Sequence, residues 1–353
     1  MKRILFLLVG LIISVISLYF AFRGFDWGGV WDAVGRMRLL FFLLMLVPYV
    51  LTFLTKVWRW RVLFHPDEKR ARLGTLFSAL MISYLPLPFR AGEVARGMVA
   101  SSRLGFPVPR VFSTILVEKV LDVLTLLLLL GISLPFVGLP PNLQSSALVL
   151  GLAVLAGSLF LLALVLRPEL ARKLAGMVAA RLPLRFAPRI AAATDQALEG
   201  LAPLASAPVA ARLGLWSIAT WGINSLTAYL LLLALNLEVS PMAAVVLVVA
   251  TNLSMAVPSA PGYIGTFELA VVAVLGVMGQ PGEAIRTFAL VYHVIGLAPV
   301  ALIGLIAALQ QGVGLTNAGR GPQSNEASAT PHPAGPWTPP GPGAQHSATR
   351  NKR

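Results

Sequence analysis

Long apolar runs are the feature that most constrains what this chain can fold into. Several of them reach about 20 residues, enough for a helix to cross a hydrocarbon core of about 30 Å. Of the 353 residues, 57% are hydrophobic and 12% are charged, whereas a soluble domain carries about 25% charged residues. The sequence therefore predicts an all-α, polytopic membrane helix bundle.

The apolar runs divide the chain into about six full spans, two interrupted segments and a polar tail. The full spans are expected at about 4–22, 39–55, 111–134, 145–166, 212–235 and 286–309, and the interrupted segments at about 75–104 and 241–279. The basic stretch 167–210 is expected to form helices on the membrane surface. Residues 311–353, rich in Pro, Gly, Ser and Asn, are predicted to be a disordered cytoplasmic tail after a membrane domain at 1–310.

The formal net charge of +14 predicts an orientation rather than a nucleic-acid partner. No RNA- or DNA-binding signature is present. The basic residues gather at Lys2 and Arg3 and in the loops 56–74 and 167–211, whereas the loops 135–145 and 236–240 carry none. Since cytoplasmic loops are enriched in Lys and Arg, we expect a protein of the cytoplasmic (inner) membrane with both termini in the cytoplasm.

Cysteine is absent and the four histidines are scattered, which excludes disulfides and thiolate metal sites and leaves no spacing suited to metal ligation. No nucleophile, metal set or nucleotide loop accompanies the acidic residues inside the spans. We therefore expect no catalytic residue, no metal and no cofactor, and a protein that is not an enzyme.

The first interrupted segment contains a proline-rich break. Pro86 and Pro88 end an apolar helix that is too short to span, and a new helix can start at Gly92 or Glu93. Irregular backbone at membrane depth survives only where protein or a water-filled cavity satisfies it. The pattern predicts a re-entrant hairpin in which the two prolines are structural hinges.

The second interrupted segment has a similar break, formed by Pro258, Pro261, Gly262 and Gly265, in which Pro258 is predicted to be a further structural hinge. Thr266 is a candidate N-cap of the next helix, and Glu268 lies in its first turn. We interpret this segment as a second re-entrant hairpin. Because each flanking helix is about 17 residues long, two full crossings remain the alternative.

A span, a broken hairpin and another span thus occur twice, and the two breaks open to opposite sides of the membrane. This order is typical of inverted-repeat transporters, whose substrates bind at broken helices near the midplane. The alternative is that Pro and Gly are simply common in membrane helices, but that does not explain why both breaks also carry a glutamate.

Charged residues inside the apolar segments are the candidate site. Arg90, Glu93 and Arg96 lie in or beside the first break, and Glu118 and Asp122 share one face of the span from about 111. Each charge near the bilayer centre costs about 2.5–3.5 kcal/mol on insertion scales, so these residues need partners or water. Arg90 and Arg96 are the expected partners of the two carboxylates.

Two interpretations of these charges remain open. In the first they line a polar cavity in which Arg90 pairs with a phosphate, helix N-termini near Gly92 and Gly265 add amide donors, and the acidic residues bind a cationic group or carry protons. In the second they form a salt-bridge cluster that locks the bundle.

Lys119 is expected to face elsewhere and to snorkel to the cytoplasmic interface. Three lone polar residues are expected to make helix–helix hydrogen bonds: Asn224, Asn252 and His293.

Three motifs carry a resemblance to a known family: Pro88-x-Arg90-x-Gly92-Glu93-x-x-Arg96, Glu118-Lys119-x-x-Asp122 and Pro261-Gly262-x-x-Gly265-x-x-Glu268. In this order and spacing the chain resembles the lysylphosphatidylglycerol synthase transmembrane family, the flippase-like membrane domain of MprF proteins and of many stand-alone bacterial and archaeal proteins. The resemblance covers about residues 5–310. It implies a helical membrane domain that transports or flips lipids, with the motif residues forming the substrate site.

The chain departs from this family in three places. No aminoacyl-transferase domain follows the membrane part, so we expect no lysyl transfer. Lys119 stands where the family pattern has Arg, and Thr266-Phe267 replaces a more usual Val-Arg before Glu268. The missing arginine weakens the expectation of charge pairing at the second break.

The expected function is the movement of an anionic phospholipid or a polyprenyl-linked lipid across the cytoplasmic membrane. The alternatives are a non-transporting accessory subunit that scaffolds a lipid synthase or glycosyltransferase, and an enzyme that acts on a lipid headgroup. The expected partners are membrane lipids and no nucleic acid. A homo-oligomer and a lipid-synthesis enzyme as partner are left open.

Overall fold

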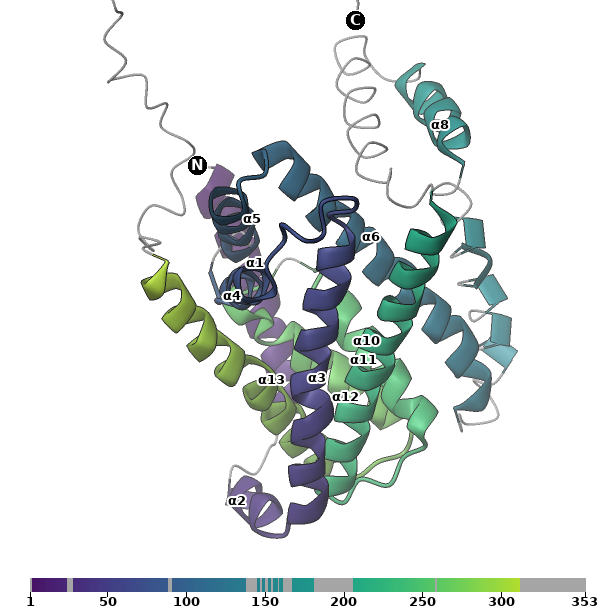
Figure 1. The fold of residues 1–353 in the computed structure, drawn as a ribbon. Coiled ribbons are helices and arrows are strands. Elements are labelled where there is room, and N and C mark those ends of the chain that lie inside the picture. Colours follow the sequence, from purple (N-terminus) through teal and green to yellow (C-terminus); the bar gives the residue numbers. More distant parts are fainter. Residues whose placement is uncertain are drawn as a thin grey trace, which may run out of the picture. The chain divides into compact units, whose positions relative to one another are not determined.

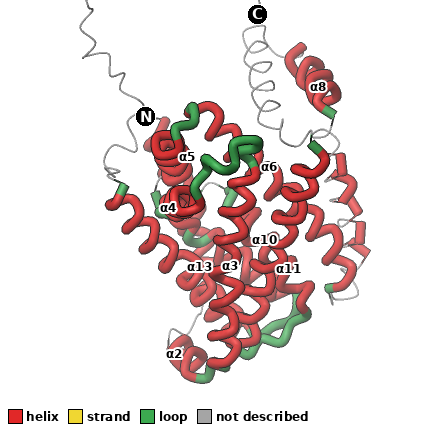
Figure 2. Tube along the Cα trace, viewed as in Figure 1, coloured by secondary structure: helices red, strands yellow, loops and turns green. Residues whose placement is uncertain are grey.

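The computed structural model describes residues 2–23, 28–87, 91–137, 167–180, 206–257 and 259–311, with short separate stretches between 145 and 160. Among these residues the regular structure is helical and no strand occurs (Figure 2), which confirms the all-α prediction. Several predictions fall outside the described residues: part of the span at 145–166, the segment 181–205, the tail from 312, and Pro88, Arg90 and Pro258.

The helices of Figure 1 run in this order: α1 Lys2–Phe22, α2 Gly28–Gly35, α3 Leu39–Val62, α4 Leu73–Ser83, α5 Ala91–Leu104, α6 Val108–Ser133, the 3-10 helix η2 Leu134–Phe136, α8 Pro168–Ala180, α10 Ala207–Ala234, α11 Pro241–Ser254, the 3-10 helix η4 Pro261–Tyr263, α12 Thr266–Val277 and α13 Gly282–Gln310. Among the described residues, α3, α10 and α13 are long and apolar enough to cross a membrane. Helix α6 has 26 residues but carries four charged side chains.

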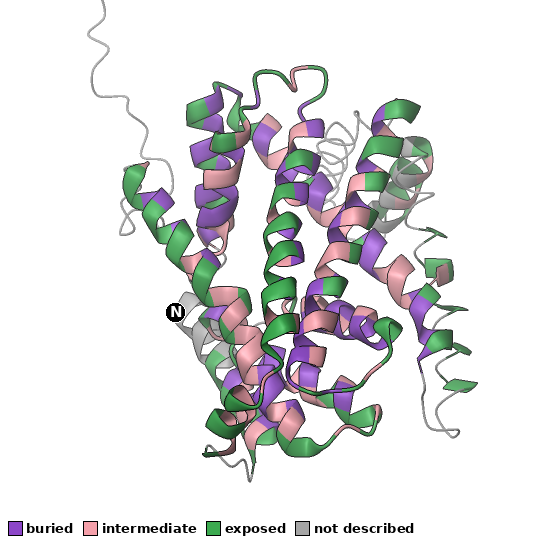
Figure 3. Ribbon diagram, turned by 60° about the horizontal axis from the view of Figure 1, so that its bottom comes forward, coloured by how far each residue is buried: buried purple, intermediate pink, exposed green. Residues whose placement is uncertain are grey.

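Apolar side chains are exposed along the outer faces of the long helices. On α3 they include Leu43, Val47 and Val50, and on α13 they include Leu302 and Ile306. Figure 3 shows how exposed and buried residues share the surfaces of these helices. In water, apolar surface of this extent favours aggregation. In a bilayer it faces lipid tails, so the burial pattern is that of a membrane protein.

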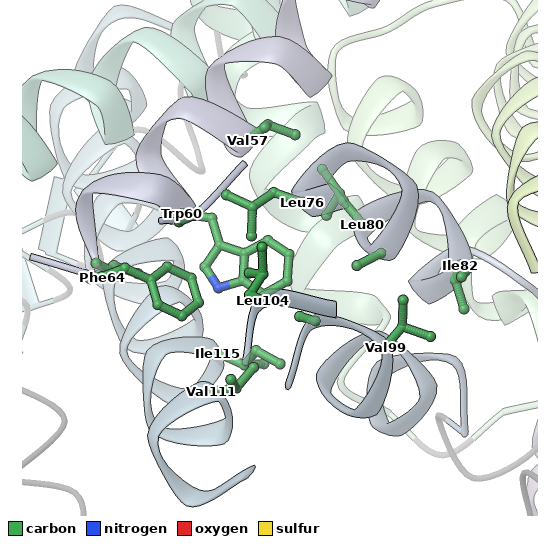
Figure 4. Close-up of a cluster of buried hydrophobic side chains, with 14 of the residues drawn as sticks. Val57, Trp60, Phe64, Leu76, Leu80, Ile82, Val99, Leu104, Val111 and Ile115 are labelled. Atoms are coloured by element: carbon green, nitrogen blue, oxygen red, sulfur yellow. The ribbon is translucent and has the colours of Figure 1, made fainter. Parts of the chain in front are cut away.

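The helices α3, α4, α5 and α6 close around one buried apolar core. Trp60 of α3 is fully buried at its centre, and Figure 4 shows its ring among side chains of all four helices. The labelled neighbours are Val57, Phe64, Leu76, Leu80, Ile82, Val99, Leu104, Val111 and Ile115. The indole N–H of Trp60 donates to Thr114 Oγ1 at 3.0 Å, so its polar atom is satisfied as a buried tryptophan requires. This core fixes the hairpin α4–α5 against α3 and α6.

Two helical hairpins are each packed between long helices. Helix α4 packs on α5, and α11 packs on α12. Helix α4 also packs on α13, α11 packs on α6, and α3 packs along α10 (Figure 1). Segments far apart in the chain therefore interlock, and each hairpin contacts a long helix of the other half.

The loop between α3 and α4 is fastened to α10 by an ion pair. Both oxygens of Glu68 accept from the guanidinium of Arg212, at 2.8 and 3.0 Å. These hydrogen bonds hold the pKa of the Glu68 carboxyl below its usual range. The loop that leads into the first hairpin is thus anchored at the basic end of α10.

The closest approach of α13 to α4 gives a test of this packing. A Cβ added at Gly304 would collide with the backbone carbonyl of Met81, whereas a Cβ at Gly296, on the same helix, would meet nothing within 4 Å. We expect Gly304→Ala to lose about 1–3 kcal/mol of stability, as overpacking typically does. The measurement is the thermal unfolding midpoint in detergent, with Gly296→Ala as the matched control. Equal midpoints for the two variants would contradict the close packing of α13 on α4.

Candidate functional site

The first break turns sharply from α4 to α5. Helix α4 ends at Ser83 and α5 begins at Ala91, slightly earlier than the predicted start at Gly92 or Glu93. A Cβ at Gly92 would lie 2.9 Å from the carbonyl oxygen of Ser83, so the first turn of α5 lies directly against the last turn of α4. Gly92 is therefore a packing residue that allows the hairpin to close.

Four charged side chains meet between α3, α5 and α6, and we call them the interior charge cluster: Arg59, Arg96, Glu118 and Asp122. Arg96 pairs with both oxygens of Glu118, at 2.5 and 3.3 Å. Arg59 pairs with Asp122 at 2.6 Å and lies 3.9 Å from Glu118. The side chains of both arginines and of Glu118 are at most 3% exposed, and Asp122 is 14% exposed. The two cations and two anions balance one another.

Polar and aromatic neighbours complete the interior charge cluster. Arg59 also donates to Ser217 Oγ at 3.2 Å, and Trp221 Nε1 donates to Asp122 at 3.1 Å, both from α10. The guanidinium of Arg96 lies 3.7 Å from the ring centroid of Trp60, which is a cation–π contact. Within the described residues, the Nε atoms of Arg59 and Arg96 have no hydrogen-bond partner. The cluster thus retains two unused N–H donors.

Of the two arginines expected to pair with the carboxylates, Arg96 does pair with Glu118, whereas Arg90 lies outside the described residues. The partner of Asp122 is Arg59 of α3, which belongs to the basic stretch 56–74 and was not predicted to lie inside the bundle. Lys119 faces away from Asp122, as expected, and its Nζ pairs with Glu93 at 2.9 Å. The face of α6 that carries Glu118 and Asp122 therefore contacts arginines of both α3 and α5, and Lys119 adds a second contact with α5.

Lys56 is a second residue that the sequence did not single out. Its Nζ donates to the Tyr84 hydroxyl at 3.0 Å, at the start of the first break. The same ammonium lies 5.1 Å from the ring centroid of Trp221 and 5.6 Å from that of Tyr84. It forms no ion pair with any described carboxylate. Lys56 is one helical turn before Arg59, so the helical period of α3 places both cations toward the bundle.

The second break is held by a glutamate and a histidine. One oxygen of Glu268 accepts from the backbone N–H of Gly265 at 2.7 Å, and the other lies 2.5 Å from Nδ1 of His293 on α13. The Nε2 of His293 lies 2.8 Å from the carbonyl oxygen of Gly262. A histidine thus takes the place of the missing arginine as the partner of Glu268. His293 does link two segments, as expected for a lone polar residue.

Backbone geometry explains the glycines of this break. Gly262 has φ +81° and Gly265 has φ +94°, a region that favours glycine. A Cβ at Gly265 would also lie 2.5 Å from the carbonyl oxygen of Ser14 on α1. Pro261 begins the 3-10 turn η4. The N-cap of α12 is Gly265 and not Thr266, because the Glu268 carboxylate already bonds the amide that ends the turn.

The two breaks lie close to each other. A Cβ at Gly262 would lie 3.7 Å from the Cβ of Pro86 and 3.2 Å from the side chain of Leu297 on α13. Tyr49 of α3 donates to the carbonyl oxygen of Ile295 at 3.0 Å, which ties α3 to the same part of α13. Residues about 175 positions apart in the sequence therefore meet between the long helices. Among the described residues no group of His, Asp and Glu has the arrangement of a metal site.

The interior charge cluster can be tested by removing one ion or a whole pair. Removing one partner of a buried ion pair typically costs about 3–5 kcal/mol, whereas replacing both partners by apolar groups is often neutral. We expect Glu118→Gln to lower the unfolding midpoint more than the double substitution Arg96→Met with Glu118→Leu. The unfolding midpoints of both variants would be measured in detergent. Glu169→Gln, which changes an exposed glutamate of α8, is the matched control. A double variant less stable than Glu118→Gln would contradict this balance.

Comparison with known proteins agrees with this architecture. The chain is 26% identical over 346 residues to the glycosyltransferase AglD of Haloferax volcanii, covering 88% of this chain and 55% of that protein. The chain thus spans little more than half the length of this relative. No solved structure matches it. The family described as the lysylphosphatidylglycerol synthase TM region matches residues 7–304. That match covers most of the chain and confirms the resemblance seen in its motifs, so the protein belongs to the lysylphosphatidylglycerol synthase transmembrane-region family.

Proposed function

We propose that this protein moves a phospholipid or a lipid-linked intermediate across the cytoplasmic membrane, with its headgroup passing beside the two breaks. The observation that carries the proposal is the close approach of the two breaks at Pro86 and Gly262. In transporters, broken helices that meet between two halves of a bundle form the substrate site. Family membership and the apolar outer surface agree with a lipid as the substrate.

The packing of the helices supports an inverted repeat, with α3 to α6 matched in order to α10 to α13. The hairpin contact of α4 with α5 then corresponds to that of α11 with α12, and the contact of α5 with α6 corresponds to that of α12 with α13. The contact of α4 with α13 corresponds to that of α11 with α6. Each hairpin thus packs against the last helix of the other half, as a pseudo-twofold relation requires.

Matching sequence features mark the same positions in both halves. A Gly-x-Pro turn precedes α6 and α13, and its glycines, Gly105 and Gly279, have φ +70° and +73°. Each half also has an acid at the third residue of the second hairpin helix, Glu93 or Glu268. Each acid pairs with a base 12 residues after the proline of that turn, either Lys119 or His293. This correspondence supports two re-entrant hairpins that enter from opposite sides.

The charges at the first break favour an anionic headgroup. Lys56 makes no ion pair within the described part of the chain, and the interior charge cluster keeps two unused N–H donors. We propose that Lys56 and Arg90 contact the phosphate, that Arg96, Glu118 and Asp122 frame the passage, and that the lipid tails stay in the bilayer. Guanidinium and ammonium groups are suited to phosphate. An anionic phospholipid and a polyprenyl phosphate share this chemistry.

The test is reconstitution of the purified full chain in liposomes that contain fluorescent lipids. Transfer between leaflets would be compared for anionic phosphatidylglycerol, a polyprenyl phosphate and neutral phosphatidylcholine. We expect wild type to move an anionic lipid, and Lys56→Gln and Arg90→Ala each to slow it at least about tenfold, which corresponds to about 1.4 kcal/mol. The matched control is Lys69→Gln, a cation in the exposed loop before α4.

Two results would count against the proposal. Equal transfer by wild type and both variants, with intact folding, would remove these cations from the mechanism. No transfer of any of the three lipids would contradict lipid movement itself.

A second candidate function rests on the longer relative. Because a glycosyltransferase contains a region similar to this chain, the membrane bundle could instead serve as a scaffold for an enzyme of lipid or glycan synthesis. Co-purification of such an enzyme, together with normal function after Lys56→Gln and Arg90→Ala, would favour the scaffold. Product formation by the purified chain alone would instead establish an enzyme that acts on a headgroup.

A further inference from the structure

The hydrogen bonds of His293 define how many protons the second break holds. The ring nitrogen Nε2 faces the carbonyl oxygen of Gly262 at 2.8 Å. A carbonyl oxygen only accepts, so Nε2 carries a proton. The other ring nitrogen, Nδ1, faces a carboxylate oxygen of Glu268 at 2.5 Å, and a bond this short needs one proton between the two atoms. The pair is therefore an imidazolium with a carboxylate, or a neutral imidazole with a carboxylic acid.

Both forms contain the same shared proton and have the same net charge of zero. If that proton leaves to water, the lone pair of Nδ1 faces an ionised Glu268 and the net charge becomes −1. The side chains of His293 and Glu268 are 11% and 5% exposed, so the two acceptors would repel each other with little solvent screening. The hydrogen bond between α12 and α13 would then be lost.

We propose that Glu268 and His293 form a proton-binding site whose loaded form holds the second break closed on α13. Proton loss would release the first turn of α12 from α13, while Glu268 keeps its hydrogen bond to Gly265. A second step rests on the proposed function: lipid movement is coupled to the binding and release of this proton.

The matching pair in the first half lacks this property. Glu93 is partnered by Lys119, and a lysine amine beside a carboxylate stays charged between pH 5 and 8. Histidine titrates near pH 6.5 in the absence of perturbation. At equivalent positions of the two halves, one acid–base pair is therefore permanently charged and the other can gain or lose a proton.

No other charged group in the described residues forms an ion pair with Glu268 or His293. Packed against α12 and α13 are α1, α2, α4, α10 and α11, and α3 makes one hydrogen bond to α13. Arg286, on α13 itself, donates to the carbonyl oxygen of Ala21. The other titratable groups on these elements are Lys2, Arg3, Tyr19, Asp32, Tyr49, Lys56, Arg59, Arg61, Arg212, Tyr229, Glu283 and Tyr292. Those in the segments beside them are Arg23, Arg36, Arg38, Arg72, Tyr84, Glu238 and Tyr263. Within the described part of the chain, Glu268 and His293 are thus each other's ion-pair partner.

The proton site can be measured without any lipid transport. The chain has four histidines. When His65, His332 and His346 are replaced by Gln and the histidine is labelled with nitrogen-15, the two ring nitrogens observed by NMR are those of His293. We expect Nε2 to stay protonated from pH 5 to 9, and the pH dependence of the Nδ1 signal to change in Glu268→Gln, because the carboxylate that shares its proton is then absent. An Nδ1 signal with the same pH dependence in wild type and in Glu268→Gln would overturn the proton site.

Coupling to lipid movement is tested in liposomes under a pH gradient. One pH unit can bias a one-proton exchange at most about tenfold, so wild type should shift the steady-state ratio of the anionic lipid between leaflets toward that value. His293→Lys recreates the pairing of the first half and should transport without responding to the gradient. Lys119→Arg is the control and should keep the response of wild type.

The outcomes separate the two proposals. An equal response in wild type and His293→Lys would overturn the coupling while leaving lipid movement intact. If no lipid moves at all, the proposed function fails, and the NMR titration still decides whether the pair binds a proton as inferred.

Discussion

A helix that stops inside a bilayer leaves backbone groups that lipid cannot hydrogen-bond, and each unsatisfied group costs several kcal/mol. At the second break, side chains replace the missing bonds. Glu268 accepts from the amide of Gly265, His293 bonds the carbonyl of Gly262, and Ser14 of α1 accepts from another amide of the break. Three helices must therefore surround this break, and the positions of α1, α12 and α13 follow from that requirement.

The two halves meet this requirement with different amounts of charge. Three residues after Glu93 lies Arg96, whereas three residues after Glu268 lies Val271. The residue before Lys119 is Glu118, whereas the residue before His293 is Tyr292. The outer acid–base pair is thus present in both halves, and the inner ion pair in the first half alone. In the proposed function, recognition of a charged headgroup would therefore belong to the first half, and the pair of Glu268 with His293 to the second.

The sequence predicts much of this fold because the membrane reduces the choices to apolar helices and their interruptions. The positions of the breaks at Pro86 and Pro261 are predictable, because proline and glycine end helices locally. The glutamates after them are recognisable as first-turn residues of the next helices. Arg59 was missed because the stretch 56–61 has the aromatic and basic composition of an interface anchor. The helical period places neighbouring residues of this stretch on different faces of α3, since Arg59 is fully buried while Trp58 is 43% exposed. That period could have identified Arg59 from the sequence.

The partner of Glu268 was missed for a different reason. His293 lies 25 residues further along an apolar helix, and only the crossing of α12 with α13 brings the two side chains together. Pairings of this kind depend on tertiary packing, which composition does not encode. Lys119 and His293 lie at the same spacing from the Gly-x-Pro turns that precede their helices. This repeated spacing indicates the pairing of His293, but it becomes evident only when α6 and α13 are aligned with each other.

The interior charge cluster is open to a structural and a functional interpretation, and the two are compatible. A buried salt bridge is weak evidence for stability, because desolvation offsets most of its attraction. Guanidinium groups bind carboxylate and phosphate with the same fork of N–H donors. Arg96 now uses that fork on Glu118 and keeps its Nε–H unused, as does Arg59. A phosphate that reaches these arginines would compete with their carboxylates for the same donors. If the proposed function is correct, the carboxylates of Glu118 and Asp122 thus hold the donors that a phosphate would use.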